Sequence, residues 1–365
     1  MARIALVTYE LNQGGTNRVL CHLANGFAEQ GHRVDVLYCT TARAQFDLDA
    51  TLRKDVNRLA FGEMDARSRG FAQFTMFRHY CRWLRRERPD IVLATGNNIS
   101  WFTALGVLIT GAAKRYYVKT TNPIIRERDS RFITWIRRHV YTYIFRRAAG
   151  VLTLSDAETR MLQSQFPLAA DKFGMVYNAY LTSQFETRDA PPRQKTDRPI
   201  TILGVGRLVQ QKRFDRLLRA FAAMRSTNAR LRIAGEGKDR EALTALAAEL
   251  GIADRVELMG YTPDVPVVMA DADLLVLSSD YEGLPAVVVE ALASNLPVIS
   301  TDCFANARDL LEGLPGCAVV EKTDDALTKA LDAWMAAPPW GLELKPYAMR
   351  YSTLSATRSH LAAMT

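Results

Sequence analysis

The feature that most constrains this chain is an alternation of strand and helix signals that runs along it in two successive series. Short apolar segments rich in β-branched residues recur between longer amphipathic segments, and this pattern predicts parallel sheets covered by helices on both faces. In the first half the predicted strands are 3–9, 33–39, 91–95, 115–120, 150–155 and 174–178. In the second half they are 200–206, 230–235, 255–260, 274–279, 297–301 and 317–320.

A break between the two series indicates two domains. The segment 187–199 is rich in proline and charge and lacks apolar periodicity, which is typical of an interdomain linker. A chain of 365 residues also fits two cores better than one. We therefore predict an α/β protein with Rossmann-like domains at 1–190 and 191–345. A ligand should lie in the cleft between them, beyond the carboxyl ends of the strands.

Composition argues against several classes of protein and site. No apolar run approaches the ~20 residues of a transmembrane helix, and the start of the chain resembles a first strand rather than a signal peptide, so we expect a cytoplasmic protein. The five cysteines form no C-x-x-C pair, and the five histidines form no ligand-spaced pair. We therefore expect neither a disulfide framework nor a bound metal.

The net positive charge of the chain comes entirely from its first half. Residues 1–195 carry 29 Lys+Arg against 17 Asp+Glu, whereas the remainder carries 18 against 22. In 71–88 and 131–148, arginines alternate with Phe, Trp, Tyr and Ile. Helices of this kind lie on anionic membrane surfaces with the apolar side down. The alternative is that the apolar side packs on the domain's own sheet. No nucleic-acid motif accompanies the charge, so nucleic acid is not an expected partner.

Two loops that follow predicted strands carry candidate phosphate ligands. After the first strand, Gly14 and Gly15 precede a helix whose free N–H groups suit a phosphate, although a plain tight turn explains a lone Gly-Gly equally well. After the first strand of the second half, Gly206 allows close backbone approach. Arg207 and Lys212 on the same loop are cations that would stabilise a diphosphate leaving group. The alternative for this loop is a solvated basic turn.

The stretch 278–300 places two carboxylates, Glu282 and Glu290, eight positions apart. This spacing is a little over two helical turns, so both side chains are expected to point into one cleft. Glu290 lies in an otherwise apolar helix, where a carboxylate without partners is costly. Sugar and ribose hydroxyls are suitable partners for the pair, and the first N–H groups of the helix suit phosphate oxygens. The alternative is one helix cap and one surface ion pair.

These motifs carry a resemblance to a known family. "GVGRL", "QKRFD", "AGEG" and "LVLSSDYEGLPAVVVEAL" resemble the donor domain of GT-B retaining glycosyltransferases of family 4, which is marked by a Glu-x7-Glu pair. In the first half, "GGTNRVLCHLANGFAEQGHRVDVL", "RRERPDIVLAT" and "RRAAGVLTLSDAETRML" are similar to the acceptor domain of the same family. The resemblance implies a GT-B fold whose C-terminal helix, 346–365, packs back on the first domain. It also implies a metal-independent, retaining transfer.

The resemblance assigns roles to residues of this sequence. The predicted catalytic residues are Arg207 and Lys212, which resemble the diphosphate clamp, and Glu282, which resembles the residue that touches the donor sugar. The predicted donor-binding residues are Gly14, Gly15, Gly206, Gly235, Glu236, Tyr261, Gly283, Leu284, Pro285 and Glu290, the last resembling the ribose ligand. On the acceptor side the candidates are Asn97, Lys119 and Asn122. Many family members carry a histidine where this chain has Lys119 to Asn122, and Lys119 is either a cation in the cleft or a surface residue.

We therefore predict a retaining glycosyltransferase, peripheral on the inner face of the cell membrane. It would move a sugar from a UDP-linked or GDP-linked donor to a glycan or lipid-linked acceptor of a surface polysaccharide or lipopolysaccharide. Two other classes fit the architecture. A sugar-nucleotide epimerase or isomerase would form product from the donor alone. A non-catalytic peripheral membrane protein would bind vesicles and leave the nucleotide sugar intact.

Overall fold

The computed structural model describes residues 1–11, 15–40, 51–61, 69–121, 124–125, 130–187, 190–195 and 197–364. The chain divides into two compact units. Unit 1 consists of residues 1–180 and 351–365, and unit 2 consists of residues 181–350. Each unit is built on one parallel sheet, which confirms the predicted fold class of two Rossmann-like α/β domains.

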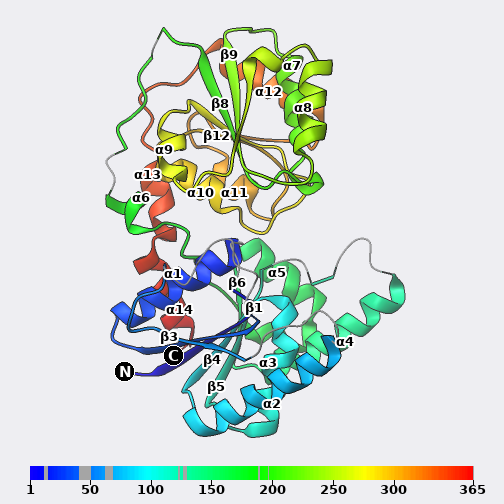
Figure 1. Ribbon diagram of the computed structural model, residues 1–365, viewed down its shortest axis with the longest axis vertical. Coiled ribbons are helices and arrows are strands. Elements are labelled where there is room, and N and C mark those ends of the chain that lie inside the picture. Colours follow the sequence, from blue (N-terminus) through cyan, green and yellow to red (C-terminus); the bar gives the residue numbers. More distant parts are fainter. Residues whose placement is uncertain are drawn as a thin grey trace. The chain divides into compact units, whose positions relative to one another are not determined.

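Unit 1 contains a seven-stranded sheet, ordered β3-β2-β1-β4-β5-β6-β7, in which every neighbouring pair is parallel (Figure 1). The strands are β1 (Arg3–Glu10), β2 (Arg33–Thr40), β3 (Asn57–Ala60), β4 (Ile91–Thr95), β5 (Arg115–Lys119), β6 (Gly150–Thr153) and β7 (Phe173–Met175). Leu6 of the inner strand β1 lies beside Val36 on one side and Leu93 on the other. All six strands predicted for this half are present, and β3 is an additional edge strand with exposed side chains.

Helices cover both faces of this sheet, because its strands are apolar on both sides. They are α1 (Gly15–Glu29), α2 (Arg69–Glu87), α3 (Asn97–Thr110), α4 (Arg131–Arg147), α5 (Asp156–Gln165) and α14 (Thr353–Met364), with the 3₁₀ helix η2 (Pro167–Lys172). Ala5 and Val7 of β1 share a core with Tyr80 of α2 and Phe102 of α3. Helices α1 and α14 pack against each other and lie together in Figure 1.

Helix α14 comes from the far end of the chain and completes unit 1. Helix α1 presents Gly26 at the contact, where an added Cβ would lie 2.1 Å from Thr357 Oγ1 of α14. A larger residue would therefore push the two helices apart. At the end of α14, the carbonyl oxygen of Met364 accepts hydrogen bonds from an Arg115 side-chain nitrogen (2.8 Å) and from Tyr117 Oη (3.0 Å), both on β5.

The bounds of the units differ from those that the sequence indicated, 190 and 345. The chain leaves unit 1 at Tyr180 and returns to it at Tyr351, and the Tyr180 N–H donates to the Tyr351 carbonyl at 3.1 Å. The described part of the predicted linker belongs to unit 2. Its Arg193 side chain donates to the Ser294 carbonyl at 2.7 Å, and burial lowers the pKa of Arg193 to about 10. Proline and charge therefore mark a segment that lies on unit 2 rather than the crossing itself.

Unit 2 contains a six-stranded parallel sheet, ordered β10-β9-β8-β11-β12-β13. The strands are β8 (Ile200–Val205), β9 (Ala229–Ala234), β10 (Val256–Gly260), β11 (Leu274–Leu277), β12 (Val298–Thr301) and β13 (Ala318–Val320). The α-helices are α6 (Ser183–Thr187), α7 (Phe214–Ala222), α8 (Arg240–Glu249), α9 (Val265–Ala270), α10 (Ala286–Ala293), α11 (Ala307–Leu311), α12 (Asp324–Ala336) and α13 (Lys345–Ala348). The 3₁₀ helices are η3 (Gln210–Lys212), η4 (Ala253–Arg255) and η5 (Met349–Tyr351), the last of which crosses into unit 1. One core joins the sheet to α7, α8 and α12, with Ile202, Leu231, Phe221 and Leu331 among its members.

The two basic helices of unit 1 differ in where their apolar side chains lie. In α2 the side chains of Met76, Tyr80, Trp83 and Leu84 are buried in the core, while the neighbouring arginines are exposed. The prediction that 71–88 lays its apolar side on a membrane is therefore wrong for the described side chains, because the sheet already covers them. Helix α4 instead exposes most of its apolar side chains, and only Ile144 and Phe145 near its end are buried. Its exposed apolar side chains, each 40% to 69% exposed, are Phe132, Ile133, Trp135, Ile136, Val140 and Tyr143.

Candidate functional site

The strand order of unit 2 creates one position where two loops diverge from the edge of the sheet. From β8 the chain moves outward through β9 and β10, and it then returns to β11 on the other side of β8. Ligands of open α/β sheets bind at such a switch point, beyond the carboxyl ends of the strands. The loops that follow β8 and β11 therefore lie side by side, and they carry Lys212 and Glu282.

Lys212 and Glu282 form an ion pair at this switch point. Lys212 Nζ lies 2.6 Å from Glu282 Oε1, and Ser279 Oγ donates to the same oxygen at 2.7 Å. The two charged side chains are only 15% and 11% exposed, so the pair is shielded from bulk water and electrostatically stronger than a surface pair. Lysine has three donors, so Lys212 keeps donors for a further acceptor. Among the described residues no hydrogen bond engages Glu282 Oε2, which leaves an acceptor for a hydroxyl group.

Several contacts fix the two loops against each other. The Asp280 N–H donates to the Gln211 carbonyl (2.9 Å), and Gln211 Nε2 donates to the Tyr281 carbonyl (2.8 Å). Below them, the guanidinium of Arg216, only 4% exposed, donates to the Ser278 carbonyl (2.7 Å) and to Asp280 (2.9 Å). The charge pair is thus held by rigid backbone. Sequence reasoning missed these supports, because residues of these types are common in any loop.

A neighbouring strand end supports Glu282 from the other side. The Glu282 N–H donates to the Cys303 carbonyl at 2.7 Å, just after β12. Burial raises the pKa of the Cys303 thiol to about 11, so this sulfur is neutral at physiological pH and is not a nucleophile. The described cysteines, Cys21, Cys81, Cys303 and Cys317, are free thiols.

Glycines allow the loops after β8 and β9 to approach each other. Gly206 and Gly235 have φ values of 155° and 153°, which side chains rarely adopt. A Cβ on Gly235 would lie 1.9 Å from the Gly206 carbonyl oxygen, and a Cβ on Gly206 would lie 3.3 Å from Lys212 Cε. The absence of a side chain at Gly206 therefore leaves room for Lys212, and its absence at Gly235 leaves room for the Gly206 carbonyl.

We expect Gly235→Ala to lower the free energy of unfolding of unit 2 by about 3 kcal/mol, because the new methyl group meets a backbone oxygen rather than a flexible side chain. Urea denaturation measures this change. Gly251→Ala is the matched control, since Gly251 also has a positive φ, 68°, but has open space around its Cβ position. It should cost only about 1 kcal/mol. Equal losses in the two variants would show that the contact with Gly206 is unimportant.

The remaining predicted donor residues lie in varied settings. Glu290 of α10 and Leu284 are buried, at 5% and 7% exposed, and Pro285 occupies the residue position just before α10 begins. Tyr261 is 44% exposed after β10. Three other predicted residues take no part in the Lys212–Glu282 contact. Gly283 is half-buried, Arg207 is exposed and pairs with no described carboxylate, and Glu236 binds Arg240 at 2.8 Å.

In unit 1 the corresponding switch point lies between β1 and β4. Gly15 begins α1 and is exposed, whereas Gly14 and Asn122 lie outside the described residues. Asn97 begins α3 directly after Gly96, but its side chain also lies outside the description. The structure therefore tests the predicted acceptor-side residues only at Lys119.

Lys119, at the carboxyl end of β5, is buried at 3% exposed. Its interpretation as a surface residue is therefore wrong. Burial lowers the pKa of Lys119 to about 7, and the Glu158 carboxylate offsets part of this effect. Burial also raises the pKa of Glu158, which accepts a hydrogen bond from the Leu154 N–H at 2.7 Å. The third ionisable group is His360 of α14, which is fully buried, and both burial and Lys119 hold its pKa well below the usual range.

Two α/β units, each built on a parallel sheet, and a shielded cation–carboxylate pair at one switch point match the architecture of GT-B glycosyltransferases, and comparison with known families identifies the class. Residues 14–179 match the family "Glycosyl transferase 4-like domain", and residues 185–350 match the family "Glycosyl transferases group 1". The chain belongs to the group 1 glycosyltransferases. The family resemblance and the glycosyltransferase activity inferred from the sequence are thereby confirmed.

Relatives of similar sequence agree with this assignment, and a solved structure shares the fold. The lipopolysaccharide 1,6-galactosyltransferase of Salmonella typhimurium is 34% identical over 252 residues, which cover 65% of this chain and 63% of that protein. The N-acetylgalactosamine-N,N'-diacetylbacillosaminyl-diphospho-undecaprenol 4-alpha-N-acetylgalactosaminyltransferase of Campylobacter jejuni is 27% identical over 64% of this chain and 62% of that protein. The Anabaena protein HepE, solved in complex with UDP, superposes with a TM-score of 0.77 at 16% identity over 99% of each chain.

Proposed function

We propose that this glycosyltransferase moves a sugar, with retention and without a metal ion, from a nucleotide-sugar donor to a glycan or lipid-linked acceptor in surface polysaccharide or lipopolysaccharide synthesis. The observation that carries the proposal is the Lys212–Glu282 pair at the switch point of unit 2. It sets a cation suited to a diphosphate beside a carboxylate suited to a sugar hydroxyl. UDP bound to HepE and the acceptors named for the two relatives support the same substrate classes.

Each group in this site has a part in the proposed reaction. As the bond from the sugar to the diphosphate breaks, negative charge grows on the leaving oxygen, and Lys212 stabilises it. Arg207, exposed on the same loop, adds a second cation when the donor is bound. Glu282 Oε2 accepts a hydrogen bond from the sugar and orients it. In a retaining transfer the acceptor attacks the face that the nucleotide leaves, and its proton passes to a phosphate oxygen of the donor. A fixed cation and a substrate base thus replace a metal and a protein base.

Helix α4 supplies the surface by which we propose that the enzyme docks on an anionic membrane. Its exposed apolar side chains lie beside the exposed arginines Arg131, Arg138, Arg146 and Arg147. The neighbouring helix α3 adds an exposed apolar stripe at helical spacing, formed by Trp101, Leu105, Leu108 and Ile109. Aromatic rings and arginines together suit the interface between lipid headgroups and acyl chains. Among the described residues, no helix is both long and apolar enough to cross a bilayer.

A screen of nucleotide sugars by thermal unfolding tests the donor site. A donor at 100 times its dissociation constant should stabilise the protein by about 2.7 kcal/mol.

We expect Glu290→Gln to weaken donor binding by about tenfold, because a buried carboxylate partner of the ribose is lost. Glu249→Gln, on the exposed side of α8, is the control and should bind normally. The proposal fails if no UDP-linked or GDP-linked sugar stabilises the protein, or if a sugar product forms from the donor without any acceptor.

A further inference from the structure

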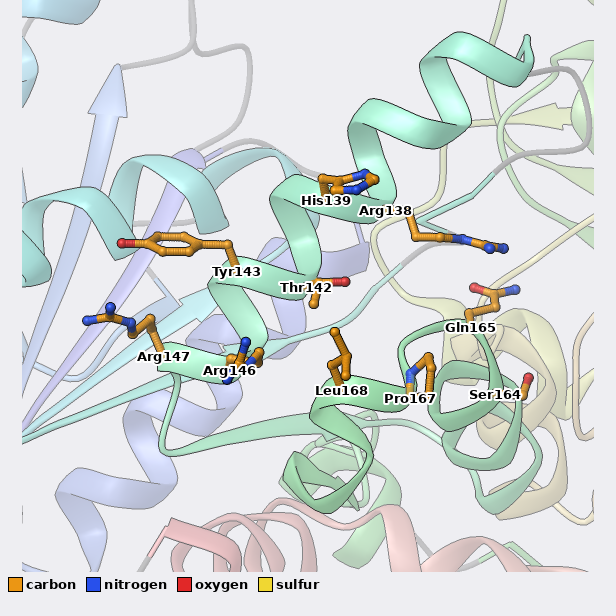
Figure 2. Close-up of a pocket in the computed structure, with 10 residues that line it drawn as sticks. All are labelled: Arg138, His139, Thr142, Tyr143, Arg146, Arg147, Ser164, Gln165, Pro167 and Leu168. Atoms are coloured by element: carbon orange, nitrogen blue, oxygen red, sulfur yellow. The ribbon is translucent and has the colours of Figure 1, made fainter.

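A groove on the flank of unit 1 lies apart from the donor site and borders the docking surface of α4. It is a cavity of about 560 Å³ between α4 and the corner where α5 passes into η2 (Figure 2). Helix α4 contributes Arg138, Arg146 and Arg147 to its lining, and the opposite wall contributes Gln165 and Leu168. Figure 2 shows Arg138 extending toward Gln165. We refer to this cavity as the basic groove.

The basic groove is lined by basic side chains and by no acidic ones. Its lining includes three arginines and His139 but no carboxylate. Within the described part of the chain, none of the three guanidinium groups forms a salt bridge, and Arg147 instead lies 5.4 Å from the centre of the Tyr143 ring. Unpaired guanidinium groups that share one concave surface attract an anion, and their planar forks match phosphate oxygens. The charge of the groove therefore indicates a phosphate-bearing ligand.

Exposed apolar side chains lie beside the arginines of the groove. Their presence favours a lipid over a free anion as the ligand. Leu168 on the wall opposite α4 is 68% exposed, and Tyr143 at the rim is 53% exposed. Ile136 and Val140 continue the exposed apolar surface from Tyr143 along α4. A phosphate at the arginines would thus have apolar surface within one or two helical turns for its hydrocarbon chains.

The topology places the basic groove away from the edge where the sugar would be transferred. Helix α4 ends at Arg147, shortly before β6 begins at Gly150, and η2 leads directly into β7 at Phe173. Both walls therefore lie near the amino ends of β6 and β7. Lys119 and the switch point lie at the carboxyl ends of the strands. A lipid in the groove is consequently not the reacting end of an acceptor.

We propose that the basic groove binds the phosphate headgroup of an anionic phospholipid of the bilayer, with the acyl chains directed along the apolar surface of α4. This inference rests on the membrane docking in the proposed function and adds a defined headgroup site to it. The groove turns a diffuse attraction to negative charge into a fixed orientation of unit 1 on the membrane.

Co-sedimentation of the full chain with vesicles tests the site. The probes are vesicles of phosphatidylcholine alone and of phosphatidylcholine with phosphatidylglycerol. We expect Arg138→Ala/Arg146→Ala to weaken binding to the phosphatidylglycerol vesicles by about thirtyfold. The control Arg78→Ala/Arg85→Ala removes the same charge from exposed positions of α2 and should lose less than about threefold. Equal losses in the two double variants would show diffuse attraction and overturn the groove.

A second variant separates the groove from overall charge and from folding. Leu168→Asp places one carboxylate in the groove at an exposed position, so it should fold normally and weaken binding to the phosphatidylglycerol vesicles by about tenfold. Leu354→Asp, at a 50% exposed position of α14, is its control and should bind almost normally. Inorganic phosphate and a short-chain soluble phosphatidylglycerol serve as competitors. Displacement by inorganic phosphate at the same concentration as by the lipid would identify a free-phosphate site and overturn the proposal.

The outcomes distinguish the groove from the function on which it rests. All groove variants should keep the thermal stabilisation by nucleotide sugar, because the donor site lies in unit 2. If the parent protein binds neither kind of vesicle, the proposals of membrane docking and of the groove are both wrong, while the transferase activity is unaffected. If the parent binds the phosphatidylglycerol vesicles and the groove variants bind equally well, the groove alone fails.

Discussion

Lys212→Met should lower kcat for sugar transfer by about a hundredfold to a thousandfold, the effect of losing one preorganised group that stabilises charge in a transition state. Lys212 is held 2.6 Å from Glu282 before any substrate arrives, so its position costs no reorganisation during the reaction. Methionine fills a similar volume without the charge. The measurement is the initial rate of nucleotide release with a saturating nucleotide-sugar donor and an acceptor.

The control for this prediction is Arg230→Met, which removes one exposed cation from the amino end of β9, at the edge of the sheet opposite the switch point. Its kcat should stay within about twofold of that of the parent, because a distant exposed charge is screened. Glu282→Gln gives the complementary result. Without the carboxylate, Lys212 is released to the diphosphate, so the nucleotide should bind at least as tightly while transfer slows. If Lys212→Met turned over substrate at the rate of the parent, the proposed role of Lys212 in stabilising the leaving group would be wrong.

Lys119→Met should raise the free energy of unfolding at pH 7 by about 4 kcal/mol. Burial lowers the pKa of Lys119 from 10.5 to about 7, and each tenfold change in proton affinity corresponds to about 1.4 kcal/mol. Between pH 7 and 10.5 the unfolded lysine holds a proton that the folded one has lost, so the stability of the parent rises with pH over this window. Below pH 7 both states are protonated, and the full cost of the buried charge remains.

Urea denaturation at a series of pH values from 7 to 10.5 measures this difference. The gap between Lys119→Met and the parent should be largest near pH 7 and should shrink as the pH approaches 10.5. Lys54→Met, an exposed lysine of unit 1, is the control and should change stability by less than about 0.5 kcal/mol. His360 contributes a rise of the same sign, but its lowered pKa places that rise below pH 6.5, outside the window. A constant gap across the series would show that Lys119 stays charged in the folded protein.

The strands and their order of appearance were predictable because they depend on short-range patterns. Apolar β-branched segments bounded by loops formed strands at every predicted position. The approach of Lys212 to Glu282, 70 positions apart, also followed from a general rule, since loops after neighbouring parallel strands share one edge. The edge strand β3 was missed because its four residues are all exposed and carry no apolar alternation.

Other features depended on tertiary contacts that no local pattern encodes. Helices α2 and α4 have similar composition, yet the described apolar side chains of α2 are mostly buried, whereas those of α4 before Ile144 are mostly exposed. Periodicity shows that a helix has an apolar face but not what covers that face. Glu282 also forms hydrogen bonds with the Ser279 hydroxyl and the Cys303 carbonyl. Both contacts likewise depend on how three loops meet. Lys119 lies close enough to His360 of α14 to lower the pKa of that histidine, and α14 comes from the far end of the sequence.

The position of α14 has a consequence for biosynthesis. During synthesis the strands of the first sheet, within residues 3–175, emerge long before α14 at 353–364, which packs on α1 over that sheet. Unit 2, being continuous from 181 to 350, is able to close on the ribosome as soon as it has emerged. Helix α1, including Gly26, therefore stays uncovered until α14 has been synthesised.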